Sequence, residues 1–196
     1  MIAIWNNKGG VGKSSLAYSL CLDLDTYYMT NDTYNSLISQ NYPKTIKEIP
    51  NEEFFKNERI IFDGGGFIDK DLSKFLKASS LVIVPLEVDL NSLTSLSNFY
   101  FDLIKLNKNV IFVLNKVENT KSGLKDKQEV LEYLNKEYGI DEANLYVMPF
   151  SKIFKKIFDL DLGVNQILSS SKINTYRYRN IKKDYNDLLN RVLITI

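Results

Sequence analysis

Histidine is absent from this 196-residue chain, and cysteine occurs once, at Cys21. Without histidine, the sequence lacks the commonest side chain for metal binding and for general acid–base catalysis. A single cysteine can form neither an internal disulfide nor the thiolate set of an iron–sulfur cluster, and its apolar helical surroundings indicate packing in a reducing compartment. Any catalysis must therefore use lysine, carboxylates, hydroxyl groups and a bound cation.

Long apolar runs and an N-terminal targeting pattern are also lacking. No run reaches about 18 consecutive apolar residues, and no basic region precedes an apolar core with a cleavage site. We therefore expect a soluble, cytoplasmic protein. Internal repeats and glycine–serine linkers are absent, so we expect a single domain over residues 1–196 that buries roughly 70% of its unfolded surface.

Six short apolar runs predict strands, at Ile2–Trp5, Thr26–Met29, Arg59–Phe62, Leu81–Pro85, Val110–Leu114 and Leu145–Met148. Apolar residues recur between them at helical spacing, as in Leu93–Ile104 and Val130–Tyr138. Alternating strands and helices predict an α/β fold: a mostly parallel sheet with helices on both faces and a ligand beyond the carboxyl ends of the strands.

Two segments depart from this alternation. Asn31–Asn57 is polar and contains tyrosines, which indicates a short helix with irregular connections. The last 25 residues predict one helix, whose buried face carries Ile181, Tyr185, Leu188 and Val192 and whose other face carries Arg179, Lys182, Lys183 and Asn186. Charge is uneven: residues 151–196 contain nine Lys or Arg and four Asp, although the whole chain has a net charge of +1.

The most informative segment follows the first predicted strand. Residues Lys8–Ser15, here called the phosphate loop, read Lys-Gly-Gly-Val-Gly-Lys-Ser-Ser and fit the pattern GxxxxGK[ST]. Its glycines allow a tight turn whose N–H groups point at phosphate oxygens. Lys13 supplies charge for the β and γ phosphates, and Ser14 supplies a hydroxyl for Mg2+. A glycine turn before a helix is the plain alternative.

Two carboxylates follow predicted strands. Asp63 precedes three glycines, at the place where nucleotide-binding sheets hold the water shell of Mg2+; an Asp-Gly turn is the alternative. Asp32 can reach the phosphates only if the second strand lies beside the first or third. There it would orient the attacking water or the metal, unless it simply begins a turn.

Lys8 has no role in this cradle. It precedes the glycines, so its side chain is directed away from the β phosphate, and a solvated loop lysine is the ordinary explanation. None of the four arginines, at positions 59, 177, 179 and 191, is near the phosphate loop, so no arginine finger is evident. Another group must neutralise charge on the γ phosphate.

In these features the chain resembles the ParA/MinD family of dimeric P-loop ATPases. Their deviant Walker A box has an early signature lysine that crosses the dimer interface to the partner's ATP. The resemblance implies a homodimer that uses ATP and Mg2+, with Lys8 acting in trans. Asp32 matches the second aspartate of the switch I motif Asp-x-Asp-Pro-Gln, which helps to activate water. The match is partial, because Thr30 replaces the first aspartate and Thr33-Tyr34 replaces Pro-Gln.

The resemblance extends in order along nearly the whole chain. Asp63 matches the switch II aspartate, Ser80–Pro85 resembles the family's next strand, and Asn115-Lys116 and Met148-Pro149 match segments near the adenine. The implied nucleotide-binding residues are Gly9, Gly10, Val11, Gly12, Lys13, Ser14, Ser15, Asn115 and Pro149. The implied metal-holding residues are Ser14 and Asp63, and the implied catalytic residues are Lys8, Lys13 and Asp32.

The chain begins at the phosphate loop and so resembles the small ParA proteins. Their ATP-bound dimers bind DNA without sequence preference and segregate plasmids or position cargo, with a ParB-like or other centromere-bound adaptor. The implied DNA-binding residues are Lys152, Lys155, Lys156, Arg177, Arg179, Lys182 and Lys183. Such contacts weaken with salt. The resemblance also implies association with the nucleoid in the ATP-bound state, whereas an ordinary solvated helix face would explain the same charges.

Two other functions remain open. A MinD-like protein would insert the segment Asn190–Ile196 into a membrane. Its apolar positions continue the stripe from Ile181, however, which favours packing on the body. A metabolic P-loop enzyme, such as a dethiobiotin-synthetase-like ligase, would need a second-substrate motif that is not evident, and it would leave Lys8 without a role.

Overall fold

The computed structural model describes residues 1–31, 38, 41–48, 50, 52–66, 68 and 70–195. Within these residues, six parallel strands form one sheet in the order β2-β3-β1-β4-β5-β6. They are β1 (Ile2–Trp5), β2 (Tyr27–Thr30), β3 (Ile60–Gly64), β4 (Leu81–Glu87), β5 (Val110–Val117) and β6 (Leu145–Pro149). The predicted parallel sheet is confirmed, and each predicted strand overlaps an observed one.

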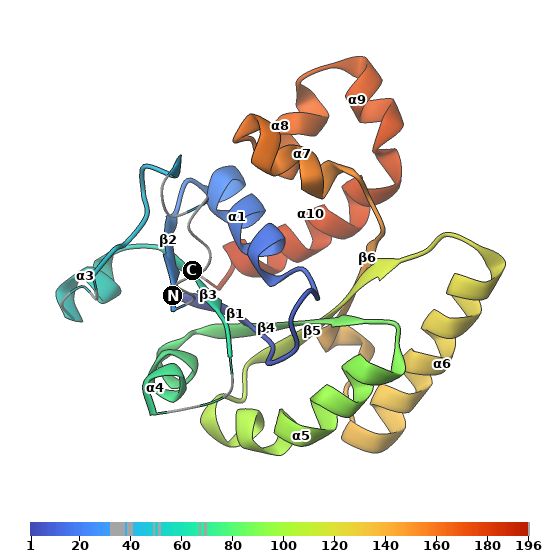
Figure 1. The fold of residues 1–196 in the computed structure, drawn as a ribbon, viewed down its shortest axis with the longest axis horizontal. Helices are drawn as coiled ribbons and strands as arrows, with labels where there is room; N and C mark the ends of the chain where they lie inside the picture. Colours follow the sequence, from blue (N-terminus) through green and yellow to red (C-terminus); the bar gives the residue numbers. More distant parts are fainter. Residues whose placement is uncertain are drawn as a thin grey trace.

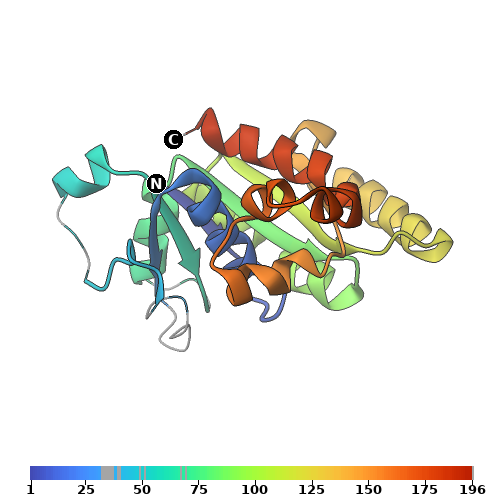
Figure 2. The same cartoon turned by 90° about the horizontal axis from the view of Figure 1, so that it is seen from above.

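Helices cover both faces of the sheet (Figure 1). One face carries α1 (Lys13–Leu24), α7 (Ile153–Leu160), α8 (Val164–Ser169), α9 (Lys172–Arg177) and α10 (Arg179–Leu193). The opposite face carries α4 (Lys70–Ala78), α5 (Leu90–Leu106) and α6 (Lys121–Tyr138). The short helix α3 (Glu52–Asn57) precedes β3, and the 3-10 helix η1 (Glu142–Asn144) precedes β6. Figure 2, seen from above, shows α7 to α10 in orange and red in front of the sheet, with α10 running across it.

Strand β1 is apolar on both sides because both faces of the sheet are covered. Its side chains alternate between two cores: Ile2 and Ile4 pack with α1 and the C-terminal helices, whereas Ala3 and Trp5 pack in the layer of α4 to α6. All four residues are fully buried. The strand therefore fixes where the phosphate loop begins.

The strand order reverses between β1 and β4. The chain leaves β1 for β2 on one side, and it later crosses from β3 past β1 to β4 on the other. In open α/β sheets a crevice forms at such a point, outside the carboxyl ends of the strands. The phosphate loop, Asp63 and Glu87 follow or end β1, β3 and β4 at this edge.

A half-buried carboxylate joins α1 to the C-terminal helices. Asp23 accepts hydrogen bonds from the backbone N–H groups of Asn165 (3.0 Å) and Gln166 (3.3 Å) and from the Tyr185 hydroxyl (2.8 Å). It thereby satisfies N–H groups in the first turn of α8, which have no partner within that helix. A Cβ on Gly163 would lie 2.2 Å from the Asp23 carboxylate, so this junction requires glycine.

Two further polar contacts join the same helices. The Tyr18 hydroxyl donates to Asp161, which ends α7, over 2.7 Å. The Ser19 hydroxyl lies 2.8 Å from the Tyr185 hydroxyl and accepts from the backbone N–H of Val164. Helix α1, which begins at the phosphate loop, is thus bonded to α7, α8 and α10.

The prediction of one C-terminal helix is wrong. The segment forms α9 and α10, which meet at Tyr178, where φ is −110° and ψ is 19°. Tyr178 is buried, whereas Ile173 and Tyr176 of α9 are exposed. The spacing of apolar residues could not predict this turn, because a tyrosine is compatible with both a helix and the end of a helix. The predicted buried face of α10 is confirmed at Ile181, Tyr185, Leu188 and Val192.

The polar segment after β2 is described only in part. Helix α3 lies in it, as predicted, and residues 44–46 run beside β2 at the edge of the sheet. The backbone N–H of Tyr28 donates to Lys44, and that of Ile46 donates to the Tyr28 carbonyl. This pairing covers part of an otherwise open strand edge.

Candidate functional site

The phosphate loop has the backbone that its glycines predict. Gly10 (φ 79°) and Gly12 (φ 94°) adopt left-handed conformations, which glycine tolerates best. A Cβ on Gly12 would lie 2.2 Å from Asn115 Nδ2, so the fold itself requires that glycine. A Cβ on Gly9 would meet no protein atom within 4 Å. The space in front of Gly9 is therefore open to a ligand.

Side chains hold the loop from behind. Asn115 is buried and donates from Nδ2 to the Val11 carbonyl (2.8 Å), and Lys116 Nζ donates to the Gly10 carbonyl (2.6 Å). Within each planar peptide the N–H points opposite to the C=O. The next N–H groups are thereby turned to the other side, as a phosphate cradle requires. Lys13 Nζ donates to the Lys8 carbonyl (2.9 Å).

Lys8 lies in an ionic cluster formed within one chain. Its Nζ is 2.8 Å from Asp89 Oδ2 and 3.2 Å from Glu87 Oε2, and it donates to the Ser92 hydroxyl over 2.9 Å. We call Glu87 and Asp89 the acidic pair. The Lys8 side chain is only 22% exposed, so it is not a solvated loop lysine in this structure.

The acidic pair also joins neighbouring elements. Glu87 forms a second ion pair with Lys116, and Asp89 is the N-cap of α5, where it accepts from the backbone N–H of Ser92 over 2.7 Å. Burial lowers the pKa of Lys8, but hydrogen bonds to Asp89 and Glu87 outweigh it and raise that pKa. Burial likewise opposes the charge of Asp89, whose pKa the Lys8 ammonium nevertheless lowers. The Lys8 ammonium and the Asp89 carboxylate are therefore both charged at neutral pH.

Asp63 is buried at the carboxyl end of β3. Strand β2 pairs with β3 so that Thr30 lies opposite Asp63. The Tyr28 hydroxyl donates to Asp63 Oδ2 over 2.7 Å, and the Thr30 hydroxyl donates to the Asp63 carbonyl over 2.8 Å. Burial raises the pKa of Tyr28, and the Asp63 charge adds to this effect. The condition set for Asp32 is met, since β2 lies beside β3, but Asp32 itself lies outside the described residues.

Two of the glycines after Asp63 are held by the side chains of Asn31 and Trp5. Asn31 donates from Nδ2 to the Gly65 carbonyl (3.0 Å) and accepts from the Gly65 N–H (2.8 Å). The Trp5 indole N–H donates to the Gly66 carbonyl over 3.1 Å. Residues 63–66, here called the Asp63 loop, are thus bonded to β1, to β2 and to Asn31 directly after it.

These residues fit a nucleotide with Mg2+. Ser14 lies in the first turn of α1, where helix N–H groups and the helix dipole favour phosphate. A hydroxyl and a carboxylate are the hard oxygen ligands that Mg2+ prefers. Asp63 is the one fully buried carboxylate among the described residues. Because burying a charge is costly, its place beside an anion-binding loop favours a cation there.

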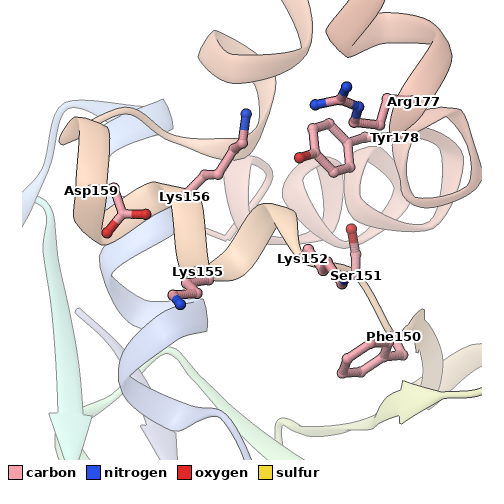
Figure 3. Close-up of a pocket in the computed structure, with 8 residues that line it drawn as sticks. All are labelled: Phe150, Ser151, Lys152, Lys155, Lys156, Asp159, Arg177 and Tyr178. Atoms are coloured by element: carbon pink, nitrogen blue, oxygen red, sulfur yellow. The ribbon is translucent and has the colours of Figure 1, made fainter.

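Four of the predicted DNA-binding residues line one groove (Figure 3). The groove measures about 720 Å³ and lies between α7 and the end of α9. Its basic lining residues are Lys152, Lys155, Lys156 and Arg177, and Phe150 and Tyr178 lie among them. Lys156 Nζ is 5.7 Å from the centre of the Tyr178 ring. We call this the basic groove.

The other three predicted DNA-binding residues lie elsewhere. Arg179 stacks on the Tyr176 ring at 4.3 Å, and Lys182 lines a second groove together with Asp23. Lys183 is exposed on α10. The structure therefore does not gather all seven predicted residues on a single surface feature.

Of the two residues predicted to lie near the adenine, Asn115 contacts the phosphate loop, whereas Pro149 lies in β6. Asn115 bonds to Val11 and so supports the phosphate loop from behind. Pro149 ends β6, which pairs with β5. Val11 is buried, and Ser15 follows Ser14 in the first turn of α1. Contacts of Asn115 and Pro149 with adenine stay predictions.

Sequence reasoning missed Tyr28, the acidic pair and the role of Lys116. Glu87 and Asp89 follow the buried run that forms β4, which places them at the carboxyl edge. Their proximity to Lys8, however, depends on β4 lying next to β1. Tyr28 likewise reaches Asp63 only because β2 lies beside β3. The strand order was the missing information.

The sheet order, the glycine loop after β1 and the carboxylate ending β3 define the P-loop NTPase fold. No known family model matches the sequence, and no curated protein matches it. Solved structures of ParA/MinD type do match, at low identity. A Borrelia burgdorferi protein assigned to plasmid partition and bound to AMPPNP is 14% identical, with a TM-score of 0.60 over 100% of this chain and 98% of that one.

Two further neighbours have the same fold. Apo McdA from Cyanothece is 11% identical, with a TM-score of 0.69 over 98% of each chain. The septum site-determining protein MinD from Pyrococcus horikoshii, complexed with Mg-ADP, is 12% identical, with a TM-score of 0.65 over 97% of this chain and 94% of that one. The fold expected from the resemblance to ParA/MinD ATPases is therefore confirmed.

Proposed function

We propose that the chain is a Mg2+-dependent ATPase that works as a ParA-like dimer. The observation that carries the proposal is the phosphate loop, which has left-handed glycines and open space at Gly9. It follows β1 at the same edge of the sheet at which the buried carboxylate Asp63 lies near the end of β3. The neighbours bound to AMPPNP and to Mg-ADP support the same class of ligand.

Each residue has a separate task in this proposal. The loop N–H groups bind the phosphates, and Lys13 brings charge to the β and γ phosphates. Ser14 and Asp63 hold Mg2+, which when bound neutralises phosphate charge. Asp32 orients the attacking water. The chain's own groups thus cover binding, charge and water positioning, apart from one further charge at the γ phosphate.

We assign that charge to Lys8 of the second subunit. Lys8 lies at the carboxyl edge of the sheet, whereas Arg59 precedes β3 at the opposite edge. To reach a partner's nucleotide, Lys8 must leave the acidic pair. Dimer formation therefore exchanges an ion pair within the chain for a contact between chains.

Such a dimer is proposed to bind DNA without sequence preference through the basic groove, and so to drive plasmid or chromosome segregation or the positioning of another cargo. Four basic groups around one groove suit phosphate contacts. Association with the nucleoid in the ATP state and stimulation by a ParB-like or other adaptor complete the proposal. The Borrelia and MinD neighbours, by their names, serve plasmid partition and septum placement.

Phosphate release from ATP tests the enzymatic part. We expect slow hydrolysis that requires Mg2+. The rate should fall about 10²-fold or more in Lys13→Ala, which is the usual loss when one electrostatic catalytic group is removed. Lys70→Ala, an exposed lysine of α4, is the matched control and should hydrolyse normally. A folded wild-type protein that neither binds nor hydrolyses ATP would contradict the proposal.

A second candidate, a MinD-like membrane protein, has one observation in its favour. The expectation that the whole apolar tail packs on the body is wrong for Leu193 and Ile194, which are 42% and 78% exposed, while Val192 is buried. No helix in the described part of the chain is long and apolar enough to cross a membrane. Liposome flotation with ATP that is lost in Leu193→Ser/Ile194→Ser would favour this candidate over DNA binding.

A further inference from the structure

Tyr28 has an unusual place for a tyrosine in a core strand. It lies in β2, is fully buried, and its ring packs among apolar residues of the core that contains α1. Valine, isoleucine or leucine would fill such a position without a polar atom. The hydroxyl instead reaches Asp63 Oδ2 at 2.7 Å. The question is whether this bond only satisfies a buried phenol or also serves the carboxylate.

The register of the sheet explains the contact. Tyr28 lies opposite Ile61, and Thr30 lies opposite Asp63. Side chains two apart along a strand point to the same face. Tyr28 and Asp63 therefore both face α1, the helix that begins at the phosphate loop. The phenol extends along the strand direction toward the carboxylate that the proposed function assigns to Mg2+.

Other residues already fix the backbone around this carboxylate. Thr30 bonds to the Asp63 carbonyl, Asn31 bonds twice to Gly65, and Trp5 bonds to Gly66. These contacts hold the Asp63 loop in spite of its glycines, but none of them acts on the carboxylate oxygens. A carboxylate can still rotate about its side-chain bonds when its backbone is fixed. The Tyr28 hydroxyl acts directly on that rotation.

We propose that Tyr28 is a positioning residue, which orients the Asp63 carboxylate for the water shell of the nucleotide-bound Mg2+. This inference rests on the proposed function. Partners that hydrogen-bond to metal-holding carboxylates orient them, and losing such a partner costs about 10- to 100-fold in metal affinity or activity. Asp63 is buried, so little water competes with the phenol for this task.

Tyr28→Phe in the full chain removes the hydroxyl and keeps the ring. Calorimetric titration of ADP at a series of Mg2+ concentrations, and in EDTA, separates the metal from the nucleotide. We expect the Mg2+ concentration for half-maximal enhancement of ADP binding to rise about tenfold. Affinity for ADP in EDTA should stay unchanged, because the phosphate loop is untouched.

Tyr42→Phe is the matched control. Tyr42 is also buried, and its hydroxyl donates to the backbone carbonyls of Thr26 (2.7 Å) and Cys21 (3.2 Å), away from the carboxylate. Both variants should lower the melting temperature, since each removes a buried hydrogen bond. Only Tyr28→Phe should change the Mg2+ dependence. If both variants retain the wild-type Mg2+ dependence, Tyr28 is merely structural and the proposal is overturned.

Asp63→Asn distinguishes this outcome from failure of the proposed function. A loss of Mg2+ dependence in Asp63→Asn with none in Tyr28→Phe would overturn the positioning role alone. Wild-type Mg2+ dependence in Asp63→Asn would instead overturn the assignment of Asp63 to the metal, on which both proposals rest. Circular dichroism of each variant establishes that it is folded.

Discussion

At the residue scale, the glycines of the phosphate loop serve two different purposes. Gly12 is required by the fold, since its φ of 94° and its closeness to Asn115 exclude a side chain. Gly9 meets no such constraint from the protein. The two positions can therefore separate the needs of folding from those of ligand binding.

Alanine substitutions test that separation. Gly12→Ala should lower the free energy of unfolding by about 1–2 kcal/mol from the left-handed backbone alone, and by more from the clash. Gly9→Ala should change it by less than about 0.5 kcal/mol. Gly9→Ala should nevertheless weaken ATP binding, because its Cβ intrudes on the phosphates. Urea unfolding and calorimetry measure both quantities.

Gly139→Ala is the control for backbone strain alone. Gly139 ends α6 with a φ of 64° and has no atom near its missing Cβ. Gly139→Ala should lower the free energy of unfolding without changing the affinity for ATP. Normal ATP affinity in Gly9→Ala would contradict the placement of phosphates in front of that residue.

The acidic pair gives a second prediction at this scale. Partly exposed ion pairs contribute up to about 1 kcal/mol, which corresponds to about fivefold in an equilibrium constant. If Lys8 must leave the pair to act in trans, Asp89→Asn should lower the protein concentration for ATP-dependent dimerisation by up to about fivefold. Asp102→Asn, which breaks the exposed pair with Lys105, is the control. Light scattering after gel filtration measures the dimer; weaker dimerisation in Asp89→Asn would contradict the exchange.

At the element scale, the strands could be predicted closely and the C-terminal helices could not. Strands buried on both faces are nearly uniform apolar runs, so Ile2–Trp5 and Leu81–Pro85 stand out in the sequence. The turn at Tyr178 left no such signal, because no glycine or proline marks it. Its cause is tertiary: the tyrosine packs into the core next to α7 and α10.

The junction of α1 with α8 is testable at the same scale. Asp23→Ala should lower the free energy of unfolding by about 2–3 kcal/mol, since hydrogen bonds to a charged group are lost and N–H groups of α8 lose their acceptor. Asp23→Asn should lose less, because an amide oxygen can still accept. Asp102→Ala, on the exposed face of α5, should stay within about 0.5 kcal/mol of wild type. Equal stability of all three variants in urea would show that Asp23 does not hold the junction.

At the scale of the whole molecule, the sequence predicted where the candidate site lies in the sheet better than it predicted which side chains contact one another there. The positions of Lys13, Ser14 and Asp63 at the carboxyl edge of the sheet could be predicted, because the loop motif and the strand ends have local sequence signals. The contacts of Lys8 with Glu87 and of Tyr28 with Asp63 join residues 79 and 35 positions apart. Such pairs depend on strand order, which local patterns do not encode.

The basic groove leads to the prediction for DNA. Lys152→Ala/Lys155→Ala should reduce the slope of log affinity against log salt by about two, because each phosphate contact contributes about 0.9. Lys121→Ala/Lys125→Ala, two lysines of α6, should leave the slope unchanged. Fluorescence anisotropy with random duplex DNA and ATP measures the slope at several salt concentrations. An unchanged slope in Lys152→Ala/Lys155→Ala would show that DNA does not bind in the basic groove.

The bonds between α1 and the C-terminal helices limit how a nucleotide could control that groove. Tyr18, Ser19 and Asp23 join α1, the helix that begins at the phosphate loop, to α7, α8 and α10 by hydrogen bonds. We therefore expect the phosphate loop and the basic groove to move as one unit. ATP binding should then leave the shape of the basic groove unchanged. We expect ATP to control DNA binding through dimer formation instead, because a dimer brings two basic grooves to one duplex. Linking two weak binding sites in this way raises avidity by about 10²- to 10⁴-fold without any new contact.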